Sequence, residues 1–364
     1  MKVESLPAVS HADRRRLLDR LGDADVHAAA LESLGCLRLV EAAPPPAAGD
    51  PATAPPDRLR VGAWNVERGT WLAGSGRLLR SVAADVLLLS ELDVGMARSG
   101  QRHVPRELAA AAGHGYAFAV EFLELGLGGR VERERHGGEQ NEVGLHGNAV
   151  LSRRPLRRPA VLRFDRSGDW FTAERGEPRV GGRCAVAATV DGPGGGDLAV
   201  VATHLESHGD PDQRARQMAI LLDAVDEYSE GGPAVVGGDL NTFSAPAVEI
   251  YSSRLRRELL AGGPDRFIDP VPHEPLFAEA ARRGFTWEEA NVRAPTQRTR
   301  RDGSPRPPLM HLDWILVRGL GATGPAVVPA VDDAGLALSD HELVAVTLVP
   351  LVPPGPLTTG AAPT

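Results

Sequence analysis

Short apolar runs recur along most of the chain, and several of them are apolar at every position. Residues 86–89, VLLL, are an example, and such a strand needs cover on both faces. Runs of this kind occupy residues 59–64, 85–90, 117–123, 147–152, 183–190, 198–204, 234–240, 312–317 and 343–349. This number of strands exceeds what one open sheet carries comfortably. We therefore predict two packed β-sheets with helices on their outer faces.

Helical patterns separate the apolar runs. The clearest follows Asp210 and Pro211, an N-cap and first-turn pair, after which Ala215, Met218 and Leu222 recur on one face. Further helices are expected over residues 75–83, 104–112 and 246–261. The alternation of both patterns predicts an α/β protein.

The two ends of the chain differ from this central part. Residues 1–40 show helical spacing, with Ser10 and Asp23 as plausible N-caps, and we expect a small helical segment there. Residues 41–57, EAAPPPAAGDPATAPPD, are typical of an extended linker, and the tail 351–364 is typical of a disordered segment. The main domain is thus predicted at residues 58–350, with residues 1–57 dispensable for its chemistry.

Composition limits the class of protein. Apolar residues make up 42% of the 364 residues, and no apolar stretch approaches the roughly 20 residues of a membrane helix. The first residues lack the apolar run of a secretory signal, and Cys36 and Cys184 are too few for a disulfide framework. We expect a cytoplasmic protein without a transmembrane segment or an evident partner protein, acting as a monomer.

The net charge of −8 opposes a broad electrostatic grip on nucleic acid, which needs a basic face. A nuclease remains compatible with this charge, because carboxylates that hold a divalent cation lower the net charge and the cation restores it locally.

Polar residues able to bind metal or phosphate stand at the ends of five of these runs. Each has an ordinary alternative role, since Asn often forms turns and a single acid or His is usually solvated or structural. Their joint occurrence in this position favours one shared site. The residues are Asn65, Glu91, His204, Asp239, Asn241, Asp340 and His341.

The oxygen atoms in this set favour a hard cation. Carboxylates of Glu91, Asp239 and Asp340, and amide oxygens of Asn65 and Asn241, suit Mg²⁺ or Mn²⁺ better than zinc. Phosphoester hydrolysis needs a cation at phosphoryl oxygen, a base for water and donors for the developing charge. The set could supply all three.

Seven segments, in their order along the chain, resemble the signature blocks of the endonuclease/exonuclease/phosphatase superfamily. They are VGAWNVERG, VLLLSELD, HGNAVLSRRPL, VVATHLES, VVGGDLNT, HLDWILV and LSDHELVAV, and they span roughly residues 58–349. The resemblance implies a DNase I-like four-layer α/β sandwich, in which helices flank two packed, mainly antiparallel β-sheets. It also implies a metal-dependent hydrolase acting on phosphoester bonds.

The resemblance assigns roles to the metal and water ligands. Glu91 matches the principal Mg²⁺ ligand of the family, with Asn65 beside it, and Asp340 matches the acid next to metal and phosphate. Asp239 and Asn241 match the pair that aligns the attacking water and contacts the scissile phosphate.

The resemblance also assigns the histidines. His341 matches the histidine paired with a carboxylate, here Asp313, and we favour it over Asp239 as the base because imidazole has the appropriate pKa. His204 resembles a phosphate-oxygen donor or an acid to the leaving group. Asn148 lies on the strand that carries the partner of that histidine in DNase I, and it is either a substrate-binding residue or a buried strand amide.

The substrate stays open at this level. The leading hypothesis is a Mg²⁺-dependent phosphodiesterase or nuclease that acts on a phosphoester, with nucleic acid among the candidate substrates. The alternatives are an inositol or lipid-headgroup phosphatase, a sphingomyelinase-like phosphodiesterase and, in another class, an inactive binding platform. Leu92 and Asp93 after Glu91 differ from the Thr-Lys usual in the exonuclease III branch.

Overall fold

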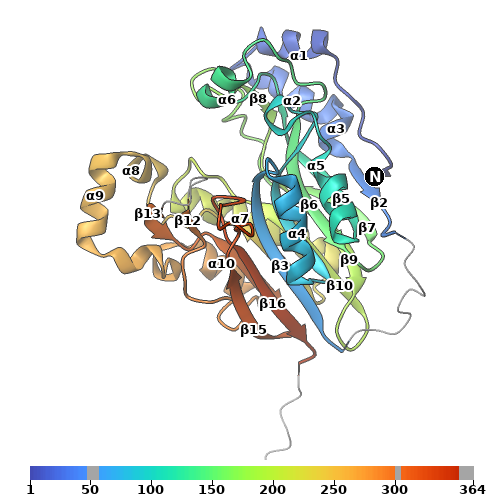
Figure 1. The fold of residues 1–364 in the computed structure, drawn as a ribbon, viewed down its shortest axis with the longest axis vertical. Coiled ribbons are helices and arrows are strands. Elements are labelled where there is room, and N and C mark those ends of the chain that lie inside the picture. Colours follow the sequence, from blue (N-terminus) through green and yellow to red (C-terminus); the bar gives the residue numbers. More distant parts are fainter. Residues whose placement is uncertain (47–56, 300–304, 352–364) are drawn as a thin grey trace, which may run out of the picture.

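The computed structural model describes residues 1–46, 57–299 and 305–351, and its centre is a large mixed β-sheet (Figure 1). In these residues the sheet has nine strands in the order β1-β2-β5-β6-β4-β3-β16-β15, with β8 paired to β5. Most neighbouring strands are antiparallel, while β1 and β2, and β3 and β4, are parallel. The strands are β1 (Lys2–Val3), β2 (Val40–Ala43), β3 (Leu59–Arg68), β4 (Val86–Val94), β5 (Gly115–Glu124), β6 (Leu145–Ser152), β8 (Arg179–Gly181), β15 (Gly321–Val328) and β16 (Leu343–Val349).

A second sheet packs against the first. Among the described residues it has five strands in the order β14-β11-β10-β9-β7, and only β10 and β11 run parallel. Its strands are β7 (Arg157–Arg163), β9 (Cys184–Asp191), β10 (Asp197–His204), β11 (Ala234–Asp239) and β14 (Asp313–Arg318), and β12 (Gln297–Thr299) pairs with β13 (Pro305–Met310) apart from it.

Alternating side chains of β4 show how the layers are held together. Val86 and Leu88 are fully buried between the two sheets, together with Val235 of β11. Leu87 and Leu89 point to the other face, where they pack beneath helices. Both faces of this strand are thus covered, as its continuous apolar sequence predicted.

Helices form the two outer layers. On the large sheet these are α4 (Leu72–Val82) and α5 (Val104–Ala112), and on the second sheet α7 (Pro211–Ser229) and α10 (Leu276–Arg282). Asp210 caps α7 as predicted, since its carboxylate accepts a hydrogen bond from Gln213 N at 2.7 Å. The four layers confirm the expected α/β sandwich.

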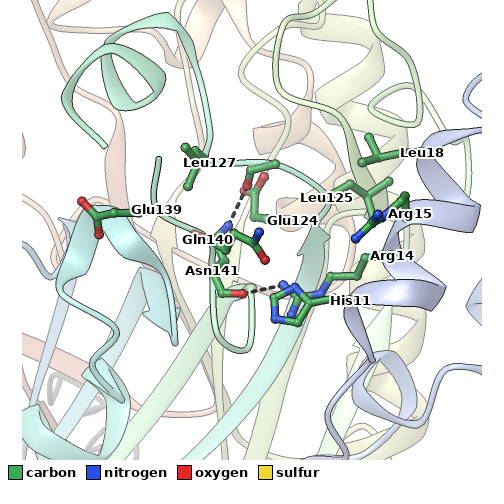
Figure 2. A pocket seen from close by; sticks show the side chains of 11 residues that line it. His11, Arg14, Arg15, Leu18, Glu124, Leu125, Leu127, Glu139, Gln140 and Asn141 are labelled. Carbon is green, nitrogen blue, oxygen red and sulfur yellow. Dashed lines mark hydrogen bonds between the residues drawn. The ribbon is translucent and has the colours of Figure 1, made fainter. Parts of the chain in front are cut away.

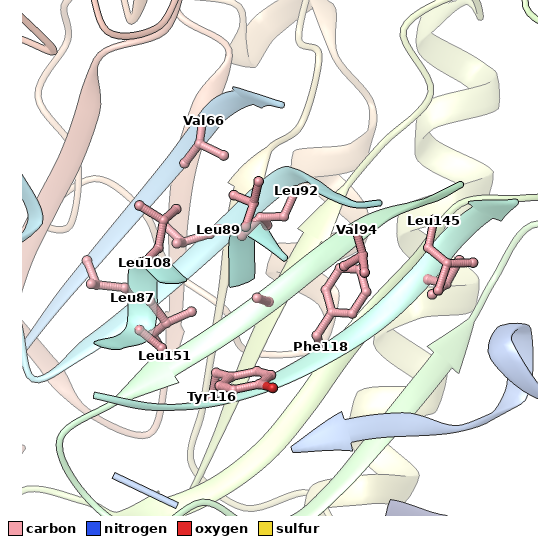
Figure 3. Close-up of a cluster of buried hydrophobic side chains, with 14 of the residues drawn as sticks. Val66, Leu87, Leu89, Leu92, Val94, Leu108, Tyr116, Phe118, Leu145 and Leu151 are labelled. Carbon is pink, nitrogen blue, oxygen red and sulfur yellow. The ribbon is translucent and has the colours of Figure 1, made fainter. Parts of the chain in front are cut away.

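The core beneath α4 and α5 is large and apolar. Figure 3 shows Leu108 of α5 over the side chains of β4, β5 and β6, among them Leu89, Phe118 and Leu151. Phe118 and Leu151 are both fully buried. This packing fixes β4, whose C-terminal half carries Glu91.

Shorter elements complete the described chain. Residues 246–261, expected as one helix, form α8 and α9, which break at Ser252. The elements are α6 (Arg130–Arg135), α8 (Ala247–Tyr251), α9 (Ser253–Gly262) and the 3₁₀ helices Ala97–Ser99, Pro264–Phe267 and Val271–His273. Within residues 1–46, 57–299 and 305–351, no helix combines the length and apolarity of a membrane span.

The N-terminal segment is part of the main fold, which corrects its expected separation. Its helices are α1 (His11–Leu18), α2 (Ala24–Ser33) and α3 (Gly35–Arg38), and β2 pairs with β5 so that Glu41 faces Phe118. Residues 41–43, expected in the linker, are therefore strand residues, because Val40 and Ala42 fill the space between the sheets. The expected linker residues 47–56 and tail residues 352–364 lie outside the described residues.

Polar contacts fasten this segment as well. Arg14 of α1 reaches the loop before β6, where its guanidinium donates to Asn141 O at 3.0 Å (Figure 2). It also donates to Glu142 O at 3.0 Å. Glu41 of β2 accepts from Tyr116 Oη at 2.6 Å and from Leu6 N at 3.1 Å. These contacts join the segment to two parts of the domain distant in sequence.

Candidate active site

Strand direction brings the predicted polar residues to one end of the sandwich. The strands β10 and β11 are parallel, so that His204 and Asp239 pair in register at their C-terminal ends. Asp313 begins β14 directly opposite Asp239. In the facing sheet, Asn65 of β3 lies beside Ser90 of the parallel strand β4. Ser90 directly precedes Glu91, so Asn65 and Glu91 lie close together. The C-terminal ends of the parallel pairs β3/β4 and β10/β11 thus lie at the same end of the sandwich.

The loop before β16 completes the group. β16 runs antiparallel to β3, which places the residues preceding β16 beside the C-terminal half of β3. Trp64 Nε1 donates to His341 O at 2.9 Å, and Ser339 Oγ donates to Asn65 O at 2.7 Å. The loop that carries His341 is therefore held by two contacts with a strand far away in sequence.

Two of the site residues adopt a left-handed backbone. Glu91 has φ 57° and Asn241 has φ 50°, and neither is glycine. At Glu91 the pairing of β4 with β6 shifts register between Leu89 and Leu92. Such residues cost about 1–3 kcal/mol each and cluster at functional sites, as do bulges that redirect a side chain.

These residues surround a cavity of about 400 Å³. Glu91, His204, Asp239, Asn241, Asp340 and His341 line it, whereas Asn65, Asp313 and Asn148 do not. Six of the nine predicted site residues thus face one space. The remaining lining residues include a group of arginines and His146, His208 and Trp170.

The predicted hydrogen bond between His341 and Asp313 is confirmed. His341 Nδ1 lies 2.8 Å from Asp313 Oδ2, and Thr296 Oγ1 donates to the same oxygen at 2.6 Å. The carboxylate accepts a hydrogen bond from Nδ1–H, which leaves Nε2 toward the cavity. Burial disfavours the imidazolium, but the charges of Asp313 and Asp239 raise the pKa of His341 well above its usual value.

Asp239 lies between two histidines. Its Oδ2 is 3.7 Å from His341 Nε2 and 3.5 Å from His204 Nε2. The amide Asn241 N donates to its Oδ1 at 2.9 Å. Burial, together with the charge of Asp313, raises the pKa of Asp239. A molecule bound in the cavity next to Asp239 would contact its carboxylate and the Nε2 atoms of the two histidines.

Asn65 positions the carboxylates, which corrects its expected role as an oxygen ligand. Its Nδ2 donates to Glu91 Oε1 at 3.2 Å and to Asp239 Oδ2 at 3.1 Å. Its Oδ1 accepts from Glu67 N at 3.0 Å, and because a backbone N–H needs an acceptor, this fixes the amide orientation. The oxygen is therefore turned away from Glu91 and Asp239.

The donor set fits a divalent cation. Burial opposes ionisation of Glu91, yet the charge of Arg68 and nearby histidines hold the pKa of this carboxyl well below its usual range. Asp239, Asp313 and His341 bring three potential ligand atoms within 4.8 Å of one another. Because His341 and Asp313 are already hydrogen-bonded to each other, Asp239 is the residue of these three that is best placed to bind an ion.

His204 is held by a residue that sequence reasoning missed. Arg183 Nη1 lies 3.0 Å from His204 Nδ1. Because a guanidinium can only donate, Nδ1 accepts this hydrogen bond, and the neutral ring carries its proton on Nε2. Burial and the charge of Arg183 lower the pKa of His204 well below its ordinary value. The ring is thus a neutral donor at its Nε2, directed to the same side as Asp239.

Asn148 does not reach the cavity. Its side chain is fully buried, and its Nδ2 donates to Cys184 O at 2.8 Å. Of the two roles considered for this residue, the structure therefore shows the buried strand amide. At its Nδ1, His204 has two charged neighbours, Arg183 and the carboxylate of Glu121 at 3.7 Å.

A second buried pair of His and Asp also faces the cavity. His146 Nδ1 lies 2.8 Å from Asp93 Oδ1, and Arg98 donates to both oxygens of Asp93. The sequence carried a signal for Asp93, which follows Glu91 in the same block. No local pattern marked Arg183, because its partners His204 and Glu121 are distant in sequence.

Comparisons with known proteins agree with this geometry. The sequence profile described as the Endonuclease/Exonuclease/phosphatase family matches residues 62–341. No curated protein sequence matches the chain. A solved endonuclease/exonuclease/phosphatase from Beutenbergia cavernae DSM 12333 has a TM-score of 0.53 and 22% identity, covering 80% of this chain and 72% of that chain.

Two further solved structures show the same fold at lower identity. A family protein from Bacteroides thetaiotaomicron has a TM-score of 0.53 and 14% identity, covering 81% of this chain and 96% of that chain. One from Bacteroides vulgatus has a TM-score of 0.50 and 16% identity, covering 80% and 98%. With its profile match and this fold, the chain belongs to the endonuclease/exonuclease/phosphatase family of phosphoester-hydrolysing enzymes.

Proposed function

We propose that the protein is a divalent-cation-dependent phosphodiesterase whose attacking water loses its proton to His341. One observation carries the proposal: Asp313, His341 and Asp239 form a buried series that ends in the cavity beside Glu91. A base next to a carboxylate on one side and an open cavity on the other is the arrangement that proton abstraction needs.

The roles follow from the contacts. A water that lies beside Asp239 Oδ2 and His341 Nε2, which are 3.7 Å apart, and hydrogen-bonds to both, attacks phosphorus and transfers its proton to Nε2. Asp313 stabilises the imidazolium that results. The bond from phosphorus to the leaving oxygen then breaks, and the electron pair goes to that oxygen. His204 Nε2–H donates to a phosphoryl or leaving oxygen, since its Nδ1 is bound to Arg183.

Glu91 and Asp340 would hold the cation, with Asp239 in reach of the same space. Both of the first two line the cavity, and carboxylate oxygens suit Mg²⁺ or Mn²⁺. When bound, the ion polarises the phosphoryl oxygen and stabilises developing negative charge. Asn65 keeps the carboxylates of Glu91 and Asp239 together by donating to both.

The experiment is a hydrolysis assay on four phosphoesters, with Mg²⁺, with Mn²⁺ and with a chelator. Bis-p-nitrophenyl phosphate reports diester cleavage, p-nitrophenyl phosphate reports monoester cleavage, and supercoiled DNA and sphingomyelin test the nuclease and sphingomyelinase alternatives. We expect cation-dependent cleavage of a diester. His341→Ala should reduce it by roughly 100-fold or more.

A matched control is His273→Ala, since His273 is exposed in a 3₁₀ helix and does not line the cavity. Monoester preference would favour the phosphatase alternative. Inactivity of the folded wild-type protein on all four compounds with either cation would contradict the proposal and favour a binding platform.

A further inference from the structure

The cavity wall carries many guanidinium groups. Arg68, Arg98, Arg175, Arg179 and Arg183 all line the same space as Glu91 and His341. They come from the end of β3, from the 3₁₀ helix Ala97–Ser99 and from the segment around β8. The proposed hydrolysis uses Arg183 to hold His204 but leaves the other four without a role.

Most of these charges have acidic partners, and the pairs differ in strength. Arg98 binds Asp93 through two nitrogens at 2.8 and 2.9 Å, a bidentate structural pair. The pairs of Arg68 are longer, with 3.4 Å to Glu132 and 4.0 Å to Glu177. Those distances allow electrostatic attraction, and Arg68 Nε is a buried donor that no acceptor in the described residues reaches.

Arg175 is held in a similarly loose manner. Its acidic neighbours are 3.9 Å away at Asp169 and 3.7 Å away at Glu206, and its guanidinium carbon lies 4.7 Å from the Trp170 ring centre. Stacking on an aromatic face restrains a guanidinium while its N–H edge stays open to a planar or tetrahedral anion. The side chains of Arg68 and Arg175 are 26% and 27% exposed.

Several buried nitrogens of this wall have no hydrogen-bond acceptor. Within the described part of the chain, these are Arg68 Nε, Arg98 Nη1, Arg175 Nη1 and Arg179 Nε. The side chain of Arg98 is only 3% exposed, so its Nη1 is a buried donor in a cavity-lining residue. Buried donors are normally paired, and a group of four at one cavity points to a ligand that supplies acceptors.

The local electrostatics agree with an anion. Burial and the nearby charges of Arg98, Arg183 and Arg68 lower the pKa of Arg179, although Glu124 acts in the opposite direction. An added negative charge would favour the charged form of Arg179, whereas, despite burial, the charges of Asp93 and Glu206 already raise the pKa values of Arg98 and Arg183. Arg68 also lies close enough to Glu91 to stabilise its carboxylate, so this wall adjoins the proposed cation site.

We propose that this wall is a second anion subsite, and that the substrate is a small phosphoester carrying another phosphate or carboxylate group bound by Arg68 and Arg175. The inference rests on the proposed function for the reacting phosphoester. The cavity of about 400 Å³ is of the size that holds a small molecule. The net charge of −8 and the confinement of these arginines to a cavity favour a small ligand over a nucleic acid polymer.

The test measures binding by calorimetry, without relying on turnover. The full chain is titrated in excess Mg²⁺ with methylphosphonate, which has one anionic group, and with alkane bisphosphonates of increasing chain length. We expect at least one bisphosphonate to bind about 10-fold or more tightly than methylphosphonate. Arg68→Gln and Arg175→Gln should each reduce that ratio by about 5-fold or more, because each removes one charged contact.

The control is Arg130→Gln, which makes the same charge change on α6. Arg130 is 75% exposed and pairs with Glu134 outside the cavity lining, so both affinities should stay as in the wild type. Equal wild-type affinities for both ligand types, or ratios unchanged in the two cavity variants, would overturn the subsite. A single-stranded oligonucleotide that binds more tightly than every bisphosphonate would assign a polymer instead and also overturn it.

Hydrolysis of bis-p-nitrophenyl phosphate, measured on the same preparations, distinguishes a failure of the anion subsite from a failure of the proposed function. This diester has no second anionic group, so its cleavage tests the proposed function alone. Cleavage without bisphosphonate preference defeats only the subsite. Bisphosphonate preference without cleavage of any phosphoester defeats the proposed function and leaves an anion-binding cavity.

Discussion

Replacing Asp313 by Asn tests the base most directly, because the change keeps the shape of the side chain and removes its charge. Asp313 is fully buried, and one of its oxygens is bound to both His341 and Thr296. Removing one member of a buried charged pair costs about 3–5 kcal/mol. That cost falls mainly on the transition state, where His341 gains its proton, and at 1.36 kcal/mol per decade it predicts roughly 10²- to 10⁴-fold slower turnover.

The assay is steady-state hydrolysis of bis-p-nitrophenyl phosphate across pH. Because Asp313 raises the pKa of His341, the variant should lose its proton at lower pH, and the acidic limb of kcat/KM should move down. We expect kcat to fall and KM to change little. Asp332→Asn, on an Asp that does not line the cavity, is the control for the substitution itself.

Two results would refute this reasoning. If Asp313→Asn raised KM but left kcat nearly unchanged, His341 would be a fixed cation that binds phosphate, and Asp239 would be the better candidate for the base. If the losses of Asp313→Asn and His341→Ala were additive in the double variant, the two residues would not act as a unit.

Four further outcomes are expected. Glu91→Gln should raise the Mg²⁺ concentration for half-maximal activity by about 10- to 100-fold in a metal titration, whereas an unchanged requirement would remove it from the metal site. Glu41→Gln should lower the melting temperature at neutral pH. Burial opposes ionisation of Glu41, but hydrogen bonds from His103 and Tyr116 lower its pKa from 4.5 to about 2, so its stabilisation is present above pH 4.5 and is lost as pH falls toward 2. The variant should therefore show a flatter dependence of stability on pH in that window. Phe118→Ala should cost about 3–5 kcal/mol in urea unfolding, since the ring is fully buried. A chain that starts at residue 57 should lose solubility, because it exposes the edge of β5; a soluble, active product would show that β2 is not needed.

The sequence predicted those parts of the fold that rest on local patterns. The apolar run at 85–90 became β4, and the capped pattern after Asp210 became α7. The site residues at strand ends were predictable for the same reason, since the chemistry stands next to the strand that positions it. His341 and Asp313 were paired correctly because both lie in blocks that resemble a known family.

Other features depend on partners that local patterns do not reveal. Val40–Ala43 has only four residues next to a Pro-rich stretch, and it becomes a strand because β5 offers an edge. The Asn65 amide donates to carboxylates of β4 and β11, and the tautomer of His204 follows from Arg183. Each is decided by a contact formed only in the folded chain.

The position of β16 has a consequence for the timing of folding during synthesis. β3 lies between β4 and β16, so one of its edges can pair early, while the other waits until residues 343–349 have left the ribosome. His341 directly precedes β16 and is anchored to Trp64 of β3. A nascent chain can thus form Glu91 and Asp239 on their strands well before it gains the base. Because contacts between such distant segments also form slowly, the enzyme should have no hydrolytic activity until β16 has paired with β3.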